Sequence, residues 1–348
     1  MAGKQQHFIP QFLQKGFSSR SSKAEHYVWV YRKGVKPFNP NTKGIGQERY
    51  FYSNATDTKV DDAITDHEDS FAIFCDQMRN DPNVIEDLNK NASRLFAHLE
   101  VRSKNIRDSF ISTSQAAFDA IFELITNPLK VERFIENRLK KDPLGFFEDQ
   151  IPKQGMRPIR RLMEAKRMRL LFLGSGKLTE GAELMADFLA SKRDEMPELI
   201  SGGIRSGQLK TLEESVVPPK RVKLFAKLEY EIVSLPNLYL GDSMVILLVE
   251  ENGCRVFKTV MSKKEKCVAA FLPLDSNTAL VGRSSNIEVD PRCFVEMIAS
   301  CSCDFFIADR LDEKLEEESE LIGKNNNLLS DKVLDEIVTD ILNDQEFL

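Results

Sequence analysis

The chain has 348 residues, with 48 basic and 54 acidic side chains and a formal net charge of −6 at pH 7. This length suffices for one large domain or two of ordinary size, and either can bury a substantial core. The negative charge disfavours adsorption of the whole chain onto nucleic acid or anionic lipid, so any site for a polyanion has to be local.

The N-terminal string MAGKQQHFIP has no apolar signal segment, and no run approaches the roughly 20 apolar residues of a membrane-spanning helix. The six cysteines lack the paired spacing of a zinc ribbon, and most lie in apolar runs, where a thiol behaves as a small hydrophobic group. We therefore expect a cytoplasmic protein without a membrane partner.

The N-terminal part has the pattern of short strands. Residues 27–31 are aromatic and β-branched, a glycine and proline turn follows, and residues 50–52 form a second aromatic run. This pattern predicts a small β layer over residues 1–56.

From residue 59 the apolar spacing changes to a helical period. Residues 60–78 place their apolar side chains on one face, and a second stripe runs from Leu88 to Ile106. A third pattern begins near residue 112, and further patterns, interrupted by proline and glycine, continue to about 195. The sequence therefore predicts a helical block over residues 57–215.

After Pro218-Pro219, short strand-like runs separated by Pro, Gly, Asp and Asn predict a second β layer over residues 216–310. The expected fold is α+β, a single domain over 1–310 with the helical block flanked by the two β layers. Residues 311–348 are expected to form a charged linker and a short amphipathic helix capped by Ser330. This helix either docks on its own domain or binds a partner or a second copy.

Several strings in order resemble a known family. They are His7-Phe8-Ile9-Pro10-Gln11-Phe12-Leu13 with Gly16-Phe17, Gln47-Glu48-Arg49-Tyr50-Phe51-Tyr52, a helix carrying Glu68, HLEVRSKNIR at 98–107, and Leu240-Gly241-Asp242-Ser243. Together they resemble the mainly bacterial family catalogued as domain of unknown function 4238, over roughly residues 5–308. The family tends to have Ser-Asp-Asn-Pro where this chain has Gly241-Asp242-Ser243-Met244. The resemblance implies no activity.

Three polar residues lie at margins of the predicted β layers. His7, fixed by the neighbouring Pro10, can bind a metal or transfer a proton, or else tie down the N-terminus by a hydrogen bond. Glu48 precedes the aromatic triplet and either faces a site or forms a surface ion pair. Asp242 follows a glycine at a strand end, which suits either a metal ligand or a plain turn.

Glu68 and Arg102 lie on predicted helices. Arg102 falls on an apolar stripe, where an unpaired charge is costly, so it needs a carboxylate or a phosphate partner. A partner such as Glu68 or Glu48 would make a structural bridge, whereas Arg102 and Arg107 together suit a substrate phosphate. His67 lies on an apolar stripe and is expected in the core.

Two functional hypotheses follow. His7, Glu48, Glu68 and Asp242 supply an imidazole and three carboxylates, a set suited to Mg²⁺ or Mn²⁺, with Arg102 stabilising charge. This favours a metal-dependent phosphodiester hydrolase, such as a nuclease effector in a bacterial toxin or antiviral setting. The alternative is a non-catalytic binding or structural module in which the same residues form a buried network.

One basic stretch is the candidate nucleic-acid contact. Its residues are Arg157, Arg160, Arg161, Lys166, Arg167 and Arg169. With helical spacing they can follow a phosphate backbone, or they form a solvated helix face diluted by Glu164. P-loop, GxSxG and HExxH strings are absent, as is a GxGxxG string after a strand, so the common nucleotide and hydrolase signatures are excluded.

Overall fold

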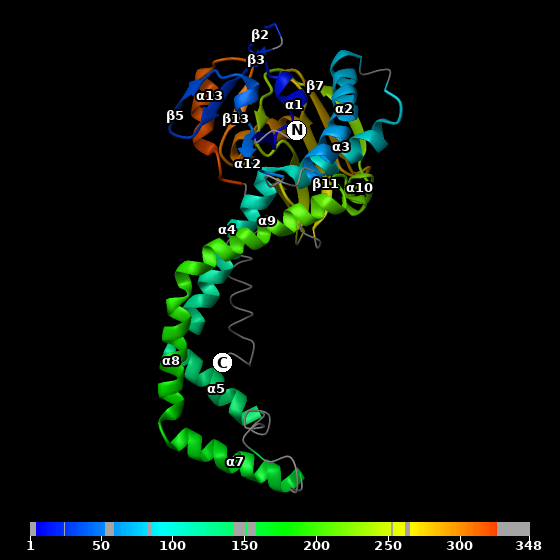
Figure 1. Cartoon of the computed structure of the whole chain (residues 1–348). Helices are drawn as coiled ribbons and strands as arrows, with labels where there is room; N and C mark the ends of the chain where they lie inside the picture. The colour runs from blue at the N-terminus through cyan, green and yellow to red at the C-terminus, as the bar shows by residue number, and fades with distance from the viewer. Residues whose placement is uncertain are drawn as a thin grey trace. The chain divides into compact units, whose positions relative to one another are not determined.

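The computed structural model describes residues 5–23, 25–52, 59–81, 85–141, 151, 158–251, 253–261 and 265–325 (Figure 1). Helices and antiparallel sheets occupy separate stretches of the chain, which confirms the predicted α+β class. By its internal contacts the chain divides into two compact units. Unit 1 comprises residues 1–110 and 203–328, and unit 2 contains residues 111–202. The single domain over residues 1–310 stays a prediction.

The largest sheet of unit 1 has five antiparallel strands in the spatial order β10-β9-β11-β12-β7. Its strands are β7 (Glu229–Ser234), β9 (Ile246–Glu251), β10 (Cys254–Lys258), β11 (Lys266–Pro273) and β12 (Thr278–Arg283). The three inner strands are apolar and buried along most of their length, so both faces of the sheet are covered. The buried residues of this sheet form one part of the apolar core of unit 1.

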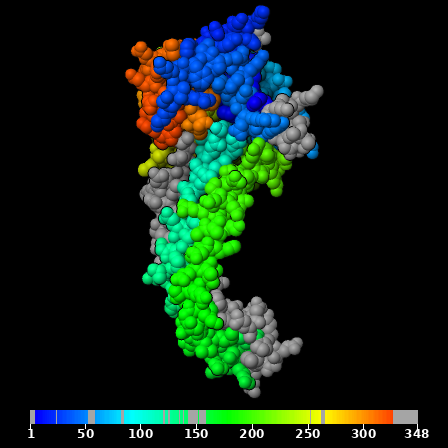
Figure 2. Space-filling model, turned by 60° about the vertical axis from the view of Figure 1, so that its left-hand side comes forward, coloured from blue at the N-terminus to red at the C-terminus, as the bar shows by residue number. Residues whose placement is uncertain are grey.

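A four-stranded sheet joins the two ends of the described chain. Its order is β5 (Val35–Phe38), β4 (Trp29–Arg32), β13 (Phe306–Ala308) and β8 (Leu240–Gly241). Strand β13 pairs antiparallel with β4 and with β8, and the rings of Tyr31 and Phe306 stack with centroids 5.0 Å apart. Figure 2 accordingly shows N-terminal residues in blue beside late residues in orange on one face of unit 1. The two expected β layers thus share one sheet.

Two small sheets and a short helix complete the N-terminal part. Strand β1 (Gln5–His7) pairs with β6 (Gln47–Arg49), and β2 (Arg20–Ser22) pairs with β3 (Glu25–Tyr27). Helix α1 (Gln11–Lys15) follows Pro10. The strand expected at 50–52 lies instead at 47–49, because Tyr50 has a φ of 55°, a left-handed conformation that ends the strand.

Unit 1 also contains the helices that carry the candidate residues. They are α2 (Lys59–Asn80), α3 (Leu88–Arg102) and α10 (Pro219–Phe225), with the first turns of α4 (Lys104–Ile125) and the last turns of α9 (Met196–Glu214). Helix α10 packs on α3, and α3 packs on β7. Phe96 of α3 contacts the rings of Phe225 and Tyr230 at centroid distances of 5.6 and 5.4 Å, which fixes these three elements together.

Ser103 separates two helices where the sequence predicted one apolar stripe from Leu88 to Ile106. Its backbone is extended, with φ −63° and ψ 141°, and its hydroxyl accepts a hydrogen bond from the backbone N–H of Ile106 at 3.3 Å. A serine that accepts from the third residue of the next helix is an N-cap. The break places Arg102 at the end of α3 and Arg107 on α4.

Unit 2 is helical in its described part. It contains most of α4, then α5 (Pro128–Lys141), α7 (Pro158–Gly174), α8 (Lys177–Ser191), a 3₁₀ turn at Arg193–Glu195 and the start of α9. Helices α5 and α8 pack side by side, and a small core is formed by Leu139, Ile151 and Ala165. None of the helices in the described segments combines the length and apolar character that crossing a membrane requires.

The acidic segment expected as a linker contains α13 (Glu313–Glu318) and a 3₁₀ turn at Ser319–Leu321. Leu315 and Ile322 are buried in the core of unit 1, only 2% and 6% exposed. The Tyr239 hydroxyl donates to the Glu318 carboxylate at 2.5 Å, and the backbone N–H of Gly323 donates to the Ser302 carbonyl at 2.9 Å. Residues 311–325 are therefore part of unit 1. The predicted helix after Ser330 lies outside the described residues.

Candidate functional site

Arg102 is the centre of a buried polar network. Its side chain is 1% exposed, and all three guanidinium nitrogens are engaged. Nε donates to the Tyr52 hydroxyl at 3.2 Å, Nη1 contacts the Glu68 carboxylate and His98 Nε2, and Nη2 donates to the backbone carbonyl of His7. The Tyr52 hydroxyl donates in turn to the Arg102 carbonyl at 2.8 Å. The guanidinium thus ties the N-terminal strand to α2 and α3.

The charges in this network are set by burial and by pairing. Burial alone would lower the pKa of Arg102, but Glu68 and Tyr52 more than compensate and raise it above its ordinary value. Burial raises the pKa of Tyr52 to about 12. Arg102 is therefore a permanent cation and Tyr52 a neutral donor. Glu68, with its side chain 26% exposed, supplies the counter-charge.

His98 has a defined tautomer in the network. Its Nδ1 lies 2.9 Å from the carbonyl oxygen of Val216, which can only accept, so Nδ1 carries the proton. Nε2 then accepts from Arg102 at 3.2 Å. Burial, followed by the charge of Arg102, lowers the pKa of His98 to about 3. The imidazole is therefore neutral and braces the guanidinium.

His7 lies at the edge of the same network. Burial lowers the pKa of its ring, and a hydrogen bond to the backbone of Thr42 opposes this shift. Its Nε2 lies 3.4 Å from Gln11 Nε2. The neighbouring Gln6 is buried, accepts from the Tyr52 backbone N–H at 2.6 Å and hydrogen-bonds to Asp61. The ring of His7 and its backbone carbonyl both therefore help to hold strand β1.

Glu48 forms a second, adjacent ion pair. Arg107 Nη2 donates to Glu48 Oε2 at 2.7 Å, and the Arg107 guanidinium carbon lies 4.3 Å from the centroid of the Phe51 ring. Arg107 is 7% exposed, whereas the Glu48 side chain is 35% exposed. Because Ser103 places the two arginines on different helices, Arg102 and Arg107 do not form a single phosphate clamp in this structure.

Asp242 is occupied by the backbone of a distant loop. Its carboxylate accepts from the backbone N–H groups of Cys303, Asp304 and Phe305, at 2.7, 2.7 and 3.3 Å. Burial raises the pKa of Asp242 to about 6, and these donors act in the opposite direction. None of its hydrogen bonds connects it to His7, Glu48, Glu68 or Arg102. Its geometry is that of an anchor between β8 and β13.

The turn at Asp242 has a backbone geometry that restricts the residues it accepts. A Cβ on Gly241 would lie 2.5 Å from the Ser302 hydroxyl oxygen, so a larger residue here would force the Ser302 side chain to move. Met244 has a φ of 62°. A proline ring fixes φ near −65°, so the turn seen here does not accept the proline that the sequence resemblance would put at residue 244.

The structure therefore brings together His7, Glu68 and Arg102, places Glu48 on the neighbouring Arg107, and holds Asp242 through other partners. Within the described residues, no group of three or more His, Cys, Asp or Glu side chains is arranged to hold a metal ion. The set proposed for Mg²⁺ or Mn²⁺ does not fit such a site here, and we derive no chemistry through a metal.

Tyr52 and His98 were not among the predicted site residues. His98 precedes Arg102 by four residues, which on a helix puts both side chains on one face, and this spacing was the available signal. Tyr52 had no comparable signal, because its hydroxyl meets Arg102 only after β6 has positioned residues 50–52 against α3. Tertiary contacts of this kind have no sequence period.

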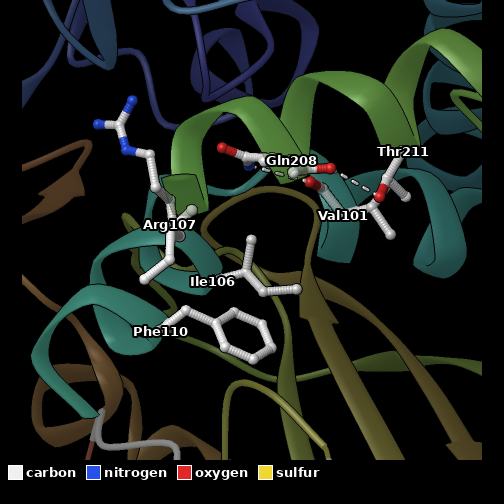
Figure 3. Close-up of a pocket in the computed structure, with 8 residues that line it drawn as sticks. Val101, Ile106, Arg107, Phe110, Gln208 and Thr211 are labelled. Atoms are coloured by element: carbon white, nitrogen blue, oxygen red, sulfur yellow. Dashed lines mark hydrogen bonds between the residues drawn. The ribbon is translucent and has the colours of Figure 1, made fainter. Parts of the chain in front are cut away.

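A pocket beside Arg107 has a largely apolar lining (Figure 3). Its volume is about 260 Å³, and it lies between the end of α3, the start of α4 and the end of α9. Ile106 and Phe110 form its wall, while the guanidinium of Arg107 points away from them. Gln208 Nε2 donates to the Val101 carbonyl at 3.2 Å, so the polar group of this wall is already engaged.

The predicted nucleic-acid contact lies on α7 of unit 2. Arg160 and Arg167 are exposed and Arg161 is half-buried, whereas Arg157 lies outside the described residues. Arg167 Nη1 is 3.6 Å from Glu164 Oε1, an exposed pair that weakens the positive face. The nucleic-acid contact stays a prediction.

Comparison with known proteins finds one family model, which matches the N-terminal part of the chain. Residues 5–152 match the family described as "Protein of unknown function (DUF4238)". The match confirms the resemblance seen in the N-terminal strings, and it covers His7, Glu48, Glu68 and Arg102 but not Asp242. No curated protein matches the chain, and no solved structure does.

Proposed function

We propose that unit 1 is a non-catalytic binding module whose Arg102 network fixes the N-terminal strand against α2 and α3. The observation that carries this proposal is the engagement of all three guanidinium nitrogens of a fully buried arginine. A group that stabilises charge on a substrate must have donors free to meet that substrate. The nitrogens of Arg102 are instead engaged by Glu68, Tyr52, His98 and the His7 carbonyl.

The phosphodiester hydrolase is the less supported alternative. It needs His7, Glu48, Glu68 and Asp242 around one open site. Glu48 and Glu68 are each bonded to a buried arginine, and Asp242 accepts three backbone N–H groups. These contacts support a structural role for Glu48, Glu68 and Asp242. A ligand would then bind in one of the pockets of the same unit.

The test compares stability with hydrolysis in the full chain. Glu68→Gln removes the counter-charge of the buried Arg102, and breaking a buried pair by removing one partner costs about 3–5 kcal/mol. We expect somewhat less, about 2–4 kcal/mol, because Glu68 is partly exposed. Asp66→Asn, an exposed change of the same charge on α2, is the control and is expected to leave the melting temperature unchanged.

The same proteins are then assayed with bis(p-nitrophenyl) phosphate in Mg²⁺ or Mn²⁺. We expect no turnover in any of them. Metal-dependent hydrolysis by the wild type that Glu68→Gln abolishes, without lowering the melting temperature, would overturn the proposal and restore the hydrolase hypothesis.

A further inference from the structure

A second pocket of unit 1 is lined by basic side chains from three separate elements. Its volume is about 490 Å³, and it lies between α2, α3 and α10. His67 comes from α2, Lys90 and Arg94 from α3, and Lys223 from α10. His67, expected in the core, is half-buried at this pocket instead. Among the described residues that line it there is no carboxylate, although the chain as a whole is acidic.

Arg94 differs from most of the other arginines that unit 1 holds partly or fully buried; of these, Arg205 donates to the Tyr50 carbonyl. Arg79, Arg102, Arg107 and Arg221 each form an ion pair with a carboxylate. Arg94 is half-buried, and within the described residues it has no ion pair or hydrogen bond. No nitrogen of Arg94 is both buried and without a hydrogen bond, so its guanidinium reaches solvent and is open to an anion that enters the pocket. Its five N–H donors suit a phosphate group in particular.

The lysines of the pocket are also available. The only carboxylate beside Lys90 in the described part is that of Asp87, at 3.8 Å. Both side chains of this pair are 70% exposed, and an exposed pair at this distance is worth little. Lys223 is exposed and has no ion pair among the described residues. An anion entering the pocket would therefore not have to break a strong contact first.

Helices α3 and α10, which line the pocket, are fixed to each other by side-chain contacts. Arg221 of α10 binds the buried carboxylate of Glu100 on α3 with two nitrogens, one of them at 2.7 Å. The carbonyl of Val216, next to the pocket wall, accepts from His98 at 2.9 Å. These contacts fix the separation of α3 and α10, so the basic groups are positioned before a ligand arrives, which lowers the entropic cost of binding.

Apart from Ser215, the rest of the lining is apolar. Val217 and Val222 provide an aliphatic surface next to the basic groups. A volume of about 490 Å³ also exceeds what a single inorganic anion fills, and lies within the range typical of small-molecule sites. The pocket therefore combines an anion-binding end with a surface for an apolar body.

We infer that this pocket binds a small organic phosphate, with the phosphate held by Arg94, Lys90 and Lys223 and the organic part lying on Val217 and Val222. His67 can donate a further hydrogen bond from its ring. The inference rests on the proposed binding function and names its ligand class. It shares no residue with the Arg102 network.

The experiment is isothermal titration calorimetry of the full chain in 150 mM NaCl, with phenyl phosphate, inorganic phosphate and phenol as probes. We expect saturable binding of phenyl phosphate, weaker binding of inorganic phosphate and none of phenol at the same concentrations. Arg94→Gln and Lys223→Gln are each expected to weaken phenyl phosphate binding at least tenfold. Lys227→Gln, an exposed lysine just after α10 that does not line the pocket, is expected to change it less than twofold.

Absence of saturable phenyl phosphate binding to the wild type would overturn the inference, as would equal weakening by Lys227→Gln, which would indicate a general charge effect. Phenol binding as tightly as phenyl phosphate would also overturn it. Because Lys223 is exposed, its variant is expected to melt like the wild type. Failure here leaves the Glu68→Gln melting result unaffected, so the two proposals fail separately.

Discussion

Protonation of the buried His98 lowers the stability of the folded chain. In the folded chain it donates from Nδ1 to Val216 and accepts at Nε2 from Arg102, so a second proton would replace an accepted hydrogen bond with a repulsion. Burial lowers its pKa from 6.5 to about 3. The unfolded chain therefore binds a proton more tightly than the folded chain, and stability is lost as the pH falls from 6.5 toward 3.

This gives a pH prediction for one residue. Between pH 6 and pH 4 the free energy of unfolding should fall by about 1.4 kcal/mol per pH unit through His98 alone. His98→Gln keeps a donor and an acceptor but cannot titrate, so its dependence on pH should be shallower by about that slope. Urea unfolding of both proteins at pH 4, 5, 6 and 7 measures the difference. Parallel curves would show that His98 does not titrate differently on unfolding.

At the residue scale, sequence reasoning identified that Arg102 needs a partner because a charge on an apolar stripe is costly, and the structure supplies Glu68. It could not identify which of Glu48 and Glu68 pairs with which arginine. That choice depends on the break at Ser103, which turns Arg107 away from Arg102. Asp242 was equally suited to a turn or to a metal, and the three backbone donors that engage it come from residues about sixty positions later.

At the element scale, helix α2 shows that hydrophobic periodicity can locate a long amphipathic helix. The helical period predicted from residue 59, with its apolar face over residues 60–78, agrees with the observed Lys59–Asn80. The acidic stretch at 313–320 illustrates the opposite case. Its charge indicates solvent exposure, whereas two apolar side chains seven residues apart, Leu315 and Ile322, anchor it to unit 1.

Helix α13 gives a matched pair of leucine substitutions. Leu315 is 2% exposed and belongs to the core, whereas Leu311 is 59% exposed just before the helix. Leu315→Ala leaves a cavity, so it should lower the free energy of unfolding by about 2–4 kcal/mol. Leu311→Ala should change it by less than about 0.5 kcal/mol, as surface substitutions do. Chemical unfolding of the full chain checks both values, and equal small effects would show that α13 does not stabilise the unit.

At the scale of the whole molecule, the chain order of unit 1 is not readable from local patterns. Strand β4 pairs with β13, more than 270 residues later, and the unit resumes at residue 203 after the helices of unit 2. Helical and strand periods indicate which face of an element is buried, but not which distant element covers it. The α+β class was therefore predictable, while the joining of both ends of the chain in one sheet was not.

Unit 1 should fold without residues 111–202. Its apolar core is formed by residues up to 101 and from 212 to 322, so removing 111–202 takes away none of that core. Phe110 and Ile204 line the same cavity of about 260 Å³, so the two cut ends lie close together within unit 1. A flexible linker of about eight Gly and Ser residues spans roughly 16 Å on average, enough to rejoin them.

We expect this shortened chain to unfold in one cooperative transition, because the five-stranded and four-stranded sheets and the Arg102 network remain complete. It should also keep the affinity for phenyl phosphate, since all of the residues that line the basic pocket belong to unit 1. Circular dichroism melting and calorimetric titration measure the two properties. A cooperative melt without phenyl phosphate binding, when the full chain does bind it, would show that unit 2 contributes to the ligand site. A chain with no cooperative melt would show that the two units depend on each other for folding.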